Sequence, residues 1–323
     1  MINYPIKFKP ILQQKVWGGN KLKDLLNKDS KQNRIGESWE ISGVTDFISI
    51  VENGSEAGTN LEQLLTKYQS DLIGKKNYTK YGTKFPLLIK FIDAKTNLSV
   101  QLHPNDELAQ QRHNAFGKTE MWYVMQADKG AKLNIGFVRD LNKSEYLDFL
   151  ERGEITKILN FEEVSRGDAF FVDTGMVHAI GAGILLAEIQ QTSDITYRIY
   201  DWDRLDEHGE GRELHTSLAL DAIDFQKTEN YKRPYTKKNN ISSEIACCEY
   251  FTTNYLPVDG KLIKDYSHLD SFIIYMCVDG TSRITTGDQT EVLKKGQSLL
   301  IPAIATTVNI EGNKAELLEV YIN

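Results

Sequence analysis

The segment SVQLHPND, residues 99–106, places a carboxamide and an imidazole two residues apart, at Gln101 and His103. The segment reads as a strand that runs into a turn, and side chains two residues apart on a strand point to the same side. An amide oxygen and an imidazole nitrogen that point the same way could bind a metal ion together. From this segment alone, a solvated polar pair at the end of a strand remains the alternative.

Two more residues complete a candidate metal site. Glu120 begins the next predicted strand in GKTEMWYV, and His178 ends the strand that follows a Gly-Asp turn. We expect the strands that carry the four residues to be neighbours in one sheet, with their inward side chains meeting inside a barrel. Two imidazoles, a carboxylate and an amide suit zinc and leave a coordination position for water or substrate. The set contains no cysteine thiolate, which argues against a closed structural zinc site. The two-histidine, one-carboxylate set also suits non-haem iron(II).

Other polar residues are predicted to lie around this site. Lys118 and Ser99 each stand two residues before a candidate ligand, so each shares its face. Glu188 and Arg198 stand among strand-forming residues, where an unpaired charge is costly. They either form an ion pair with each other or a neighbour, or they act on a ligand. Lysine, serine and arginine converging on one cavity indicate an anionic ligand, such as a phosphorylated small molecule.

The elements that must position these residues are mostly short strands separated by Gly, Asp and Asn, which predicts an all-β-dominated fold. Helical spacing of apolar residues is confined to four segments, residues 59–74, 105–113, 142–153 and 215–225. In the first of these, Thr59 or Asn60 is the predicted N-cap. One helical face there is formed by Leu61, Leu64, Leu65, Tyr68 and Leu72.

A weak internal repeat indicates two similar units. Residues 123–135 resemble residues 275–287, and a later alignment pairs Gly167 with Gly296 and His178 with Thr307. The cupin jelly roll has a pattern of two parts. The first is a strand that ends in a glycine turn, and the second is a Gly-Asp turn into a strand that ends near a histidine. We therefore expect two cupin-like jelly-roll barrels with a few short helices inserted in the N-terminal half. Residues 1–235 would form the catalytic domain, and residues 236–323 a C-terminal domain without metal ligands.

The bulk composition narrows the possible partners. The chain has 323 residues and a net charge of −7, which argues against binding to nucleic acid or to an anionic membrane. No apolar run has the length of a signal peptide or a membrane span. Its three cysteines, Cys247, Cys248 and Cys277, make no disulfide framework, so we expect a cytoplasmic protein.

The motifs together resemble those of the class I mannose-6-phosphate isomerases, also called phosphomannose isomerases. The resemblance rests on VWGG, GESWEIS, FPLLIKFIDA, SVQLHPND, GKTEMWYV, GMVHAIGAG and DITYRIYDWDR, which occur in the family's order along essentially the whole chain. The chain is similar to the short bacterial form, which has little of the helical insertion found in longer members.

This resemblance implies an enzyme with one Zn²⁺ per chain that interconverts mannose 6-phosphate and fructose 6-phosphate through a cis-enediol. The implied active-site arginine is Arg198, the proposed catalytic carboxylate is Glu188, and Ser99 and Lys118 match positions that hold the substrate or its phosphate. The spacing from the last zinc ligand to Glu188 is one residue longer than in the longer forms. The implied zinc ligands are Gln101, His103, Glu120 and His178.

Burial in an apolar barrel is expected to raise the pKa of Glu188 towards neutrality, which would suit a proton carrier. Two other functions stay open at this point. One is a cupin oxygenase that uses iron(II) at the same residues, and the other is a non-catalytic sugar-binding cupin. The expected partner is a small phosphosugar, and the chain is expected to be a monomer or a weak dimer.

Overall fold

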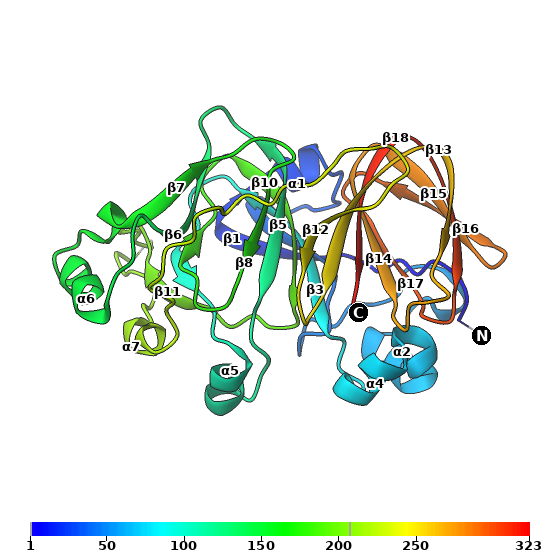
Figure 1. Ribbon diagram of the computed structural model, residues 1–323, viewed down its shortest axis with the longest axis horizontal. Coiled ribbons are helices and arrows are strands. Elements are labelled where there is room, and N and C mark those ends of the chain that lie inside the picture. The colour runs from blue at the N-terminus through cyan, green and yellow to red at the C-terminus, as the bar shows by residue number, and fades with distance from the viewer. Residues whose placement is uncertain (1, 207) are drawn as a thin grey trace.

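The computed structural model describes residues 2–206 and 208–323 of the chain, and strands dominate this described part in three sheets (Figure 1). The six-stranded sheet has the order β1 (Ile11–Gly19), β2 (Ile35–Ile41), β3 (Leu87–Ala94), β10 (Ile184–Gln191), β5 (Glu120–Ala127) and β8 (Ala169–Val172). The five-stranded sheet has the order β11 (Tyr197–Tyr200), β4 (Val100–Leu102), β9 (His178–Ala179), β6 (Lys132–Phe137) and β7 (Leu159–Glu163).

The third sheet is formed by the C-terminal part of the chain, on the right of Figure 1, and we call it the C-terminal sheet. Its main path is β12 (Ser243–Cys247), β13 (Thr252–Asp265), β18 (Thr307–Tyr321), β14 (Ile273–Asp279) and β17 (Ser298–Ile301). The hairpin of β15 (Thr281–Thr286) and β16 (Gln289–Lys294) joins it through β18.

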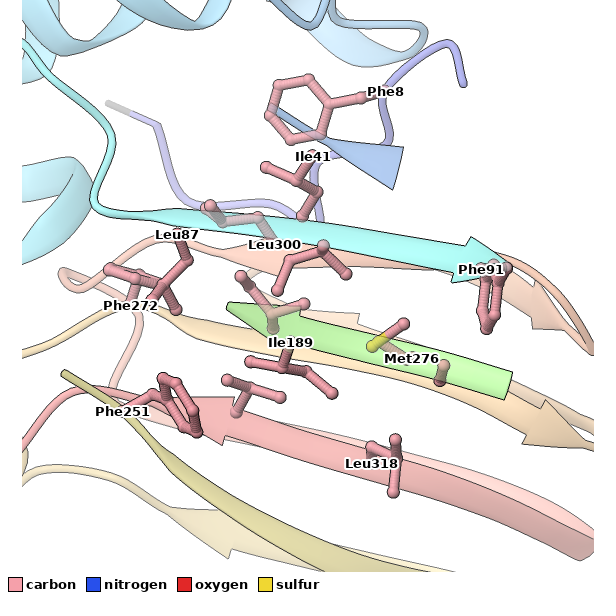
Figure 2. Packing of buried hydrophobic residues seen from close by; sticks show 14 of the residues in the cluster. Phe8, Ile41, Leu87, Phe91, Ile189, Phe251, Phe272, Met276, Leu300 and Leu318 are labelled. Carbon is pink, nitrogen blue, oxygen red and sulfur yellow. The ribbon is translucent and has the colours of Figure 1, made fainter. Parts of the chain in front are cut away.

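The six-stranded sheet is the central layer, because both of its faces are buried. Every residue of β2, β3 and β10 is buried, as expected for strands covered on two sides. On one face Leu87 and Ile189 belong to the same core cluster as Met276 and Leu318 of the C-terminal sheet (Figure 2). Alternate residues of the same strands, such as Lys90, therefore point away from that core, toward the five-stranded sheet.

The N-terminal segment packs against the C-terminal sheet rather than against its own neighbours in sequence. The backbone N–H and C=O of Ile6 both bond to Leu300 on β17, at 2.8 Å each. The backbone N–H of Ala303 bonds to the carbonyl of Leu72 at 3.0 Å, which attaches the helical segment to the same sheet. The two halves of the chain are therefore interleaved through one shared core.

The first predicted helix, residues 59–74, is divided in two. The helix α2 (Leu61–Tyr68) is capped by Asn60, one of the two predicted N-caps, in a capping box with Gln63. It ends at Gln69, whose φ of 46° lies in the left-handed region, and a second helix α3 (Ser70–Ile73) follows. The apolar periodicity does not show this break, because Leu72, which follows the break, is buried like the leucines of α2.

The other predicted helices are present as α5 (Asp106–His113), α6 (Lys143–Glu151) and α7 (Thr216–Leu220), the last shorter than predicted. Sequence analysis missed α1 (Lys21–Asp24), α4 (Lys75–Tyr81) and the single turns η1 (Gly54–Glu56) and η2 (Ile155–Lys157). The first has only four residues, and the buried residue that α4 presents is the polar Asn77, so neither has an apolar stripe. None of the described helices is long and apolar enough to span a membrane.

Candidate metal centre and active site

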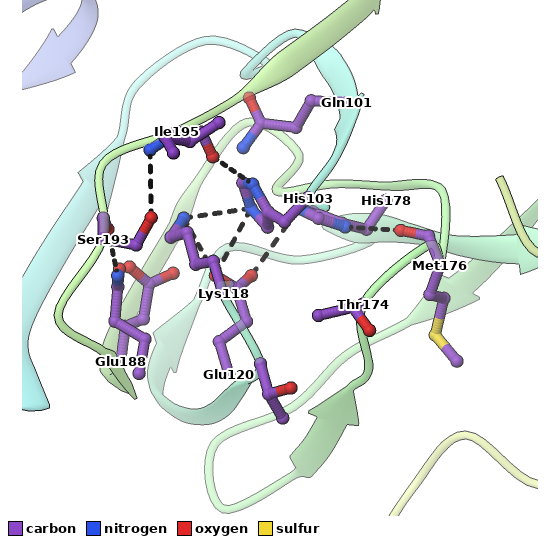
Figure 3. A network of polar contacts seen from close by, with 12 residues as sticks. Gln101, His103, Lys118, Glu120, Thr174, Met176, His178, Glu188, Ser193 and Ile195 are labelled. Carbon is purple, nitrogen blue, oxygen red and sulfur yellow. Dashed lines mark hydrogen bonds and ion pairs between the residues drawn. The ribbon is translucent and has the colours of Figure 1, made fainter. Parts of the chain in front are cut away.

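Three of the four predicted metal ligands converge at one point inside the molecule (Figure 3). The ligand atoms of His103, Glu120 and His178 all lie within 4.8 Å of one another, and each residue is only 1% exposed. Nε2 of His103 and Nε2 of His178 each stand 3.5 Å from a different oxygen of Glu120. This arrangement presents two imidazoles and one carboxylate to a single position.

The expectation that these residues lie in one sheet is wrong. Gln101 on β4 and His178 on β9 are directly paired in the five-stranded sheet, whereas Glu120 begins β5 in the six-stranded sheet. His103 follows the end of β4. The segment between β3 and β4 carries the chain from one sheet to the other, so the site forms between two facing sheets.

Backbone carbonyls fix the orientation of both histidine rings. Nδ1 of His103 donates to the carbonyl of Ile195, and Nδ1 of His178 donates to the carbonyl of Met176, each at 2.8 Å (Figure 3). Since a carbonyl only accepts, Nδ1 carries the proton in each ring, and the Nε2 lone pair faces Glu120. This orientation by a second layer of groups is typical of metal-binding histidines.

The protonation states also fit a divalent cation. Burial, assisted by the nearby charge of Lys118, holds the pKa of His103 well below its ordinary value, and burial lowers the pKa of His178 to about 4. Both rings are therefore neutral at physiological pH, as metal ligands must be. Burial raises the pKa of Glu120 to about 7, and a bound cation would hold this carboxylate ionised.

Two observations show that the point between the three candidate ligands accommodates positive charge. Nε2 of His178 is buried without a hydrogen-bond partner, although it faces the centre of the group. The ammonium of Lys118 stands 2.9 Å from Nε2 of His103 and 3.0 Å from Glu120, so a cationic group already lies against two of the three candidate ligands. The residues present therefore fit a metal ion.

The five-stranded sheet aligns Arg198, Gln101 and His178 as direct neighbours on adjacent strands. Nε of Arg198 donates to Oγ of Ser99 at 3.3 Å, and Oγ of Ser99 donates to Oε1 of Gln101 at 3.1 Å. Arg198 also donates to the backbone carbonyl of Glu213 at 2.7 Å. The structure thus brings four predicted site residues together on this wall, namely Ser99, Gln101, His178 and Arg198.

The opposite wall places Glu188 beside Lys90 rather than beside Arg198. Nζ of Lys90 lies 3.2 Å from Glu188, and Nε1 of Trp122 donates to the other carboxylate oxygen at 2.9 Å. The suggestion of an ion pair between Glu188 and Arg198 is therefore wrong, because the two stand on different sheets. The alternative of a neighbouring partner is correct, and that partner is Lys90.

The expected direction of the Glu188 pKa is also wrong. Burial raises the pKa, but the charges of Lys90 and Lys118 outweigh burial, and the pKa lies below its ordinary value. Glu188 is thus ionised at neutral pH. The larger of the two charges is that of Lys90, a buried lysine on the neighbouring strand, which the sequence alone does not place.

Sequence analysis missed a chain of buried and half-buried charges that extends from Glu188. Glu37 on β2 lies 3.8 Å from Nζ of Lys90, and Nζ of Lys15 on β1 lies 3.5 Å from Glu37. Nε1 of Trp39 donates to Glu37 at 2.6 Å. The signal available in the sequence was a lysine in the middle of the apolar run FPLLIKFIDA, where an uncompensated charge would be costly.

Most of these side chains, with the exception of His103, line one cavity of about 150 Å³ between the two sheets, which we call the first pocket. Its lining contains five cations and four carboxylates, so it carries a small positive excess. The cations are Lys15, Lys90, Lys118, Arg198 and Arg212, and the carboxylates are Glu37, Glu120, Glu188 and Asp194.

A second missed group supports the candidate ligands from outside the pocket. Asp106 accepts from the backbone N–H of Gly117 at 2.7 Å and from Nε2 of Gln191 at 3.0 Å. Oε1 of Gln191 accepts from the backbone N–H of Thr119 at 2.9 Å. The hydroxyl of Tyr250, from the C-terminal part of the chain, donates to Asp106 at 2.9 Å. This cluster joins the segment that follows His103 to the segment that precedes Glu120.

Fold and site together define a mostly-β protein with a buried His/Glu/His metal-type centre in a cation-rich pocket. The family described as phosphomannose isomerase type I, catalytic domain, matches residues 6–162, and mannose-6-phosphate isomerase, cupin domain, matches residues 241–322. The segment with His178, Glu188 and Arg198 lies between the two matched ranges.

Similar proteins extend the match to the whole chain. Mannose-6-phosphate isomerase ManA of Bacillus subtilis is 34% identical over 97% of both chains, and a mannose-6-phosphate isomerase of Streptococcus mutans is 32% identical over 96% of both. The crystal structure of the mannose 6-phosphate isomerase from Bacillus subtilis superposes with a TM-score of 0.89 at 30% identity, covering 99% of this chain and 100% of that one. The chain belongs to the type I phosphomannose isomerase family.

Proposed function

We propose that this protein is a zinc-dependent isomerase that interconverts mannose 6-phosphate and fructose 6-phosphate. The observation that carries the proposal is the buried triad of His103, Glu120 and His178, two of which line a pocket with excess positive charge. The relatives that cover nearly the whole chain are named for this activity.

In this proposal the zinc ion is held by the triad together with the amide oxygen of Gln101. When bound, the ion supplies a Lewis acid beside the sugar oxygen that becomes negative in the enediol. The network on the five-stranded sheet supports the fourth ligand, since Ser99 already donates to Oε1 of Gln101. Zinc fits better than iron(II) because an amide completes the set and the reaction requires no change of oxidation state.

Glu188 is proposed as the group that moves the proton between C1 and C2. It is ionised at neutral pH, so it starts as a base, and Trp122 and Lys90 hold its carboxylate in place. Arg198 and Ser99 are proposed to orient the anionic substrate, and Lys118 is proposed to neutralise charge near the reacting oxygens. An arginine keeps its charge here, so it serves in binding and not as a base.

We also propose that the fold consists of two cupin-like jelly-roll barrels, divided near residue 235. The five- and six-stranded sheets would enclose the first, which carries the site, and the C-terminal sheet would form the second. Thr307, the residue that the internal repeat aligns with His178, cannot replace an imidazole as a ligand. The second barrel would therefore be without the zinc site.

A coupled assay of fructose 6-phosphate formation from mannose 6-phosphate tests the function. We expect turnover in the purified protein, its loss after chelation and its return when Zn²⁺ is restored. Absence of turnover in folded, zinc-loaded protein would refute the proposal. Oxygen uptake with iron(II) would then identify the oxygenase alternative, and binding of phosphosugar without turnover would identify the non-catalytic one.

The support cluster outside the pocket gives a separate prediction. Gln191→Leu removes both of its side-chain hydrogen bonds while preserving approximate volume, and we expect zinc affinity to fall about 10- to 100-fold. Competition with a fluorescent chelator measures this change directly. Tyr250→Phe, which removes one hydroxyl of the same cluster, should give a smaller loss. Unchanged zinc affinity in Gln191→Leu, with a melting temperature that shows an intact fold, would contradict the support role.

A further inference from the structure

A second cavity, of about 460 Å³, opens in the C-terminal part of the chain, and we call it the second pocket. A glutamate, Glu319, lies at its wall and is only 1% exposed. Nothing in the isomerase mechanism uses this cavity. It is lined by Lys76, Ser242, Asn254, Lys264, Asp265, Tyr266, His268, Leu269, Asp270, Glu319, Tyr321 and Asn323.

Strand pairing makes this glutamate the counterpart of Glu188. Each part of the molecule has a row of three residues directly paired on adjacent antiparallel strands, with a buried glutamate in the middle. The rows are Lys90, Glu188 and Trp122 on β3, β10 and β5, and Asn254, Glu319 and Tyr275 on β13, β18 and β14.

A second pairing continues the same correspondence. Gln101 is paired with His178, and Asp265 is paired with Thr307. Gln101 follows the lysine of the first row by eleven residues, and Asp265 follows the asparagine of the second row by the same number. The second pocket, which Asp265 and Glu319 both line, therefore corresponds to the first pocket.

The glycine turns fix the alignment of the two parts. The backbone N–H of Gly167 bonds to the carbonyl of Val124, and that of Gly296 bonds to the carbonyl of Cys277, each at 2.8 Å. Each carbonyl lies two residues after the aromatic residue of its row. The alignment thus matches Trp122 with Tyr275, one residue away from the match that the sequence repeat indicates.

The correspondence leaves the second pocket without metal ligands. Thr307 stands for His178, Asp265 for Gln101, and Ile273 on β14 for Glu120. Asp265 is committed to a turn, where it accepts from the backbone N–H of Ser267 at 2.9 Å. A metal site of the first kind is therefore absent from the described residues of this pocket.

A preorganised polar group takes the place of the metal site. Glu319 accepts from Oγ of Ser242 at 2.7 Å and from Nδ2 of Asn254 at 2.9 Å, and it pairs with Nζ of Lys264 at 2.9 Å. The hydroxyl of the buried Tyr266 also donates to it. A fully apolar interior would give equal or greater stability than such a buried charged network, so packing alone does not account for it.

The charges of the second pocket exclude a phosphorylated ligand. Three carboxylates outnumber two lysines, and Lys264 is already paired with Glu319. Asp270 accepts from two backbone N–H groups at the start of α4, those of Lys75 and Lys76, so its charge is also committed. The lining also contains the amide and hydroxyl groups of Asn254, Asn323, Ser242 and Tyr321, beside the surfaces of Tyr266 and Leu269.

Such a mixture of donors and acceptors beside apolar walls suits a neutral, polyhydroxylated molecule. We propose that the second pocket is a binding site for an unphosphorylated hexose or a related polyol, separate from the isomerase centre. This site goes beyond the proposed function and does not depend on it.

The test uses the full-length, zinc-loaded protein, ¹⁵N-labelled, in the presence of saturating mannose 6-phosphate to fill the first pocket. D-mannose is titrated to about 50 mM, far above the dissociation constant on the order of 1 mM expected for a ligand of this size. We expect the amide signals of Ser242, Lys264 and Leu269 to shift in a saturable manner. Inorganic phosphate, titrated in parallel, should leave them unchanged.

Two substitutions of equal bulk locate the binding. Leu269→Trp adds bulk to the lining of the second pocket and leaves Glu319 itself unsubstituted. We expect the affinity for D-mannose to fall about tenfold or more, which corresponds to about 1.4 kcal/mol. Ile263→Trp is the matched control, since Ile263 on the same strand as Lys264 is 69% exposed and outside the pocket. Ser242→Ala should weaken binding through a loss of one hydroxyl.

Absence of saturable shifts at the second pocket would overturn the proposal, as would equal binding by Leu269→Trp and the control. Shifts there with inorganic phosphate would overturn the neutral-ligand assignment. The two proposals can fail separately. If the isomerase assignment is wrong, the coupled assay shows no turnover, while D-mannose still shifts the amide signals of the second pocket.

Discussion

His103→Ala is expected to abolish zinc binding at the centre and to lower isomerase turnover by at least about 10³-fold, since a catalytic metal contributes several kcal/mol to transition-state stabilisation. His103 supplies one of the two neutral imidazoles, and its ring is fixed by the carbonyl of Ile195. The ammonium of Lys118 stays 3.0 Å from Glu120 in this variant. Metal analysis and the coupled assay measure the two losses.

A matched histidine substitution separates the specific effect from a general one. His113→Ala alters an exposed residue of α5 whose Nε2 bonds to the hydroxyl of Tyr197, and it should retain zinc and turnover. A melting temperature of zinc-free His103→Ala equal to that of the zinc-free parent would show that the fold is intact. Full turnover in His103→Ala would refute the assignment of the metal centre.

Glu188→Gln is expected to lower kcat by about 10²- to 10⁴-fold, the usual contribution of a general base. Glutamine keeps the shape of the side chain and an oxygen for the N–H of Trp122, but it cannot accept the substrate proton. Zinc content should be unchanged, because Glu188 does not belong to the group of three candidate ligands. The measurement is a full kinetic analysis together with metal content.

Lys90→Met tests the same role through the pH profile. The charge of Lys90 lowers the pKa of Glu188, so its removal should raise that pKa. Since the base acts in its ionised form, the acidic limb of the kcat profile should move to higher pH in Lys90→Met. A kcat that Glu188→Gln leaves unchanged, or an acidic limb that Lys90→Met leaves in place, would exclude Glu188 as the base.

The sequence alone was sufficient for features that depend on a few neighbouring residues. The two-residue spacing in SVQLHPND places Gln101 on the pocket wall, and His103 follows where the strand ends. Local hydrogen bonds also follow from sequence, as in the Asn60 cap of α2. Such features are determined by backbone geometry over a few residues, which does not change with the rest of the fold.

The resemblance to a family contributed what local geometry could not. It implied that Glu188 is the catalytic carboxylate and Arg198 the active-site arginine, although both are far along the chain from SVQLHPND. The structure brings these residues to one pocket. Their roles remain predictions for the experiments above.

Only the tertiary structure decided how the strands combine and what charges face each other. Lys90 faces Glu188 because β3 and β10 are neighbours, a pairing between segments almost a hundred residues apart. Together with the charge of Lys118, that contact reverses the expected direction of the Glu188 pKa. A long-range hydrogen bond also joins the hydroxyl of Tyr250 to Asp106, and long-range strand pairing places Glu319 opposite Asn254. Electrostatic effects depend on distance in space, and no spacing along the chain encodes that distance for strands that are far apart in the sequence.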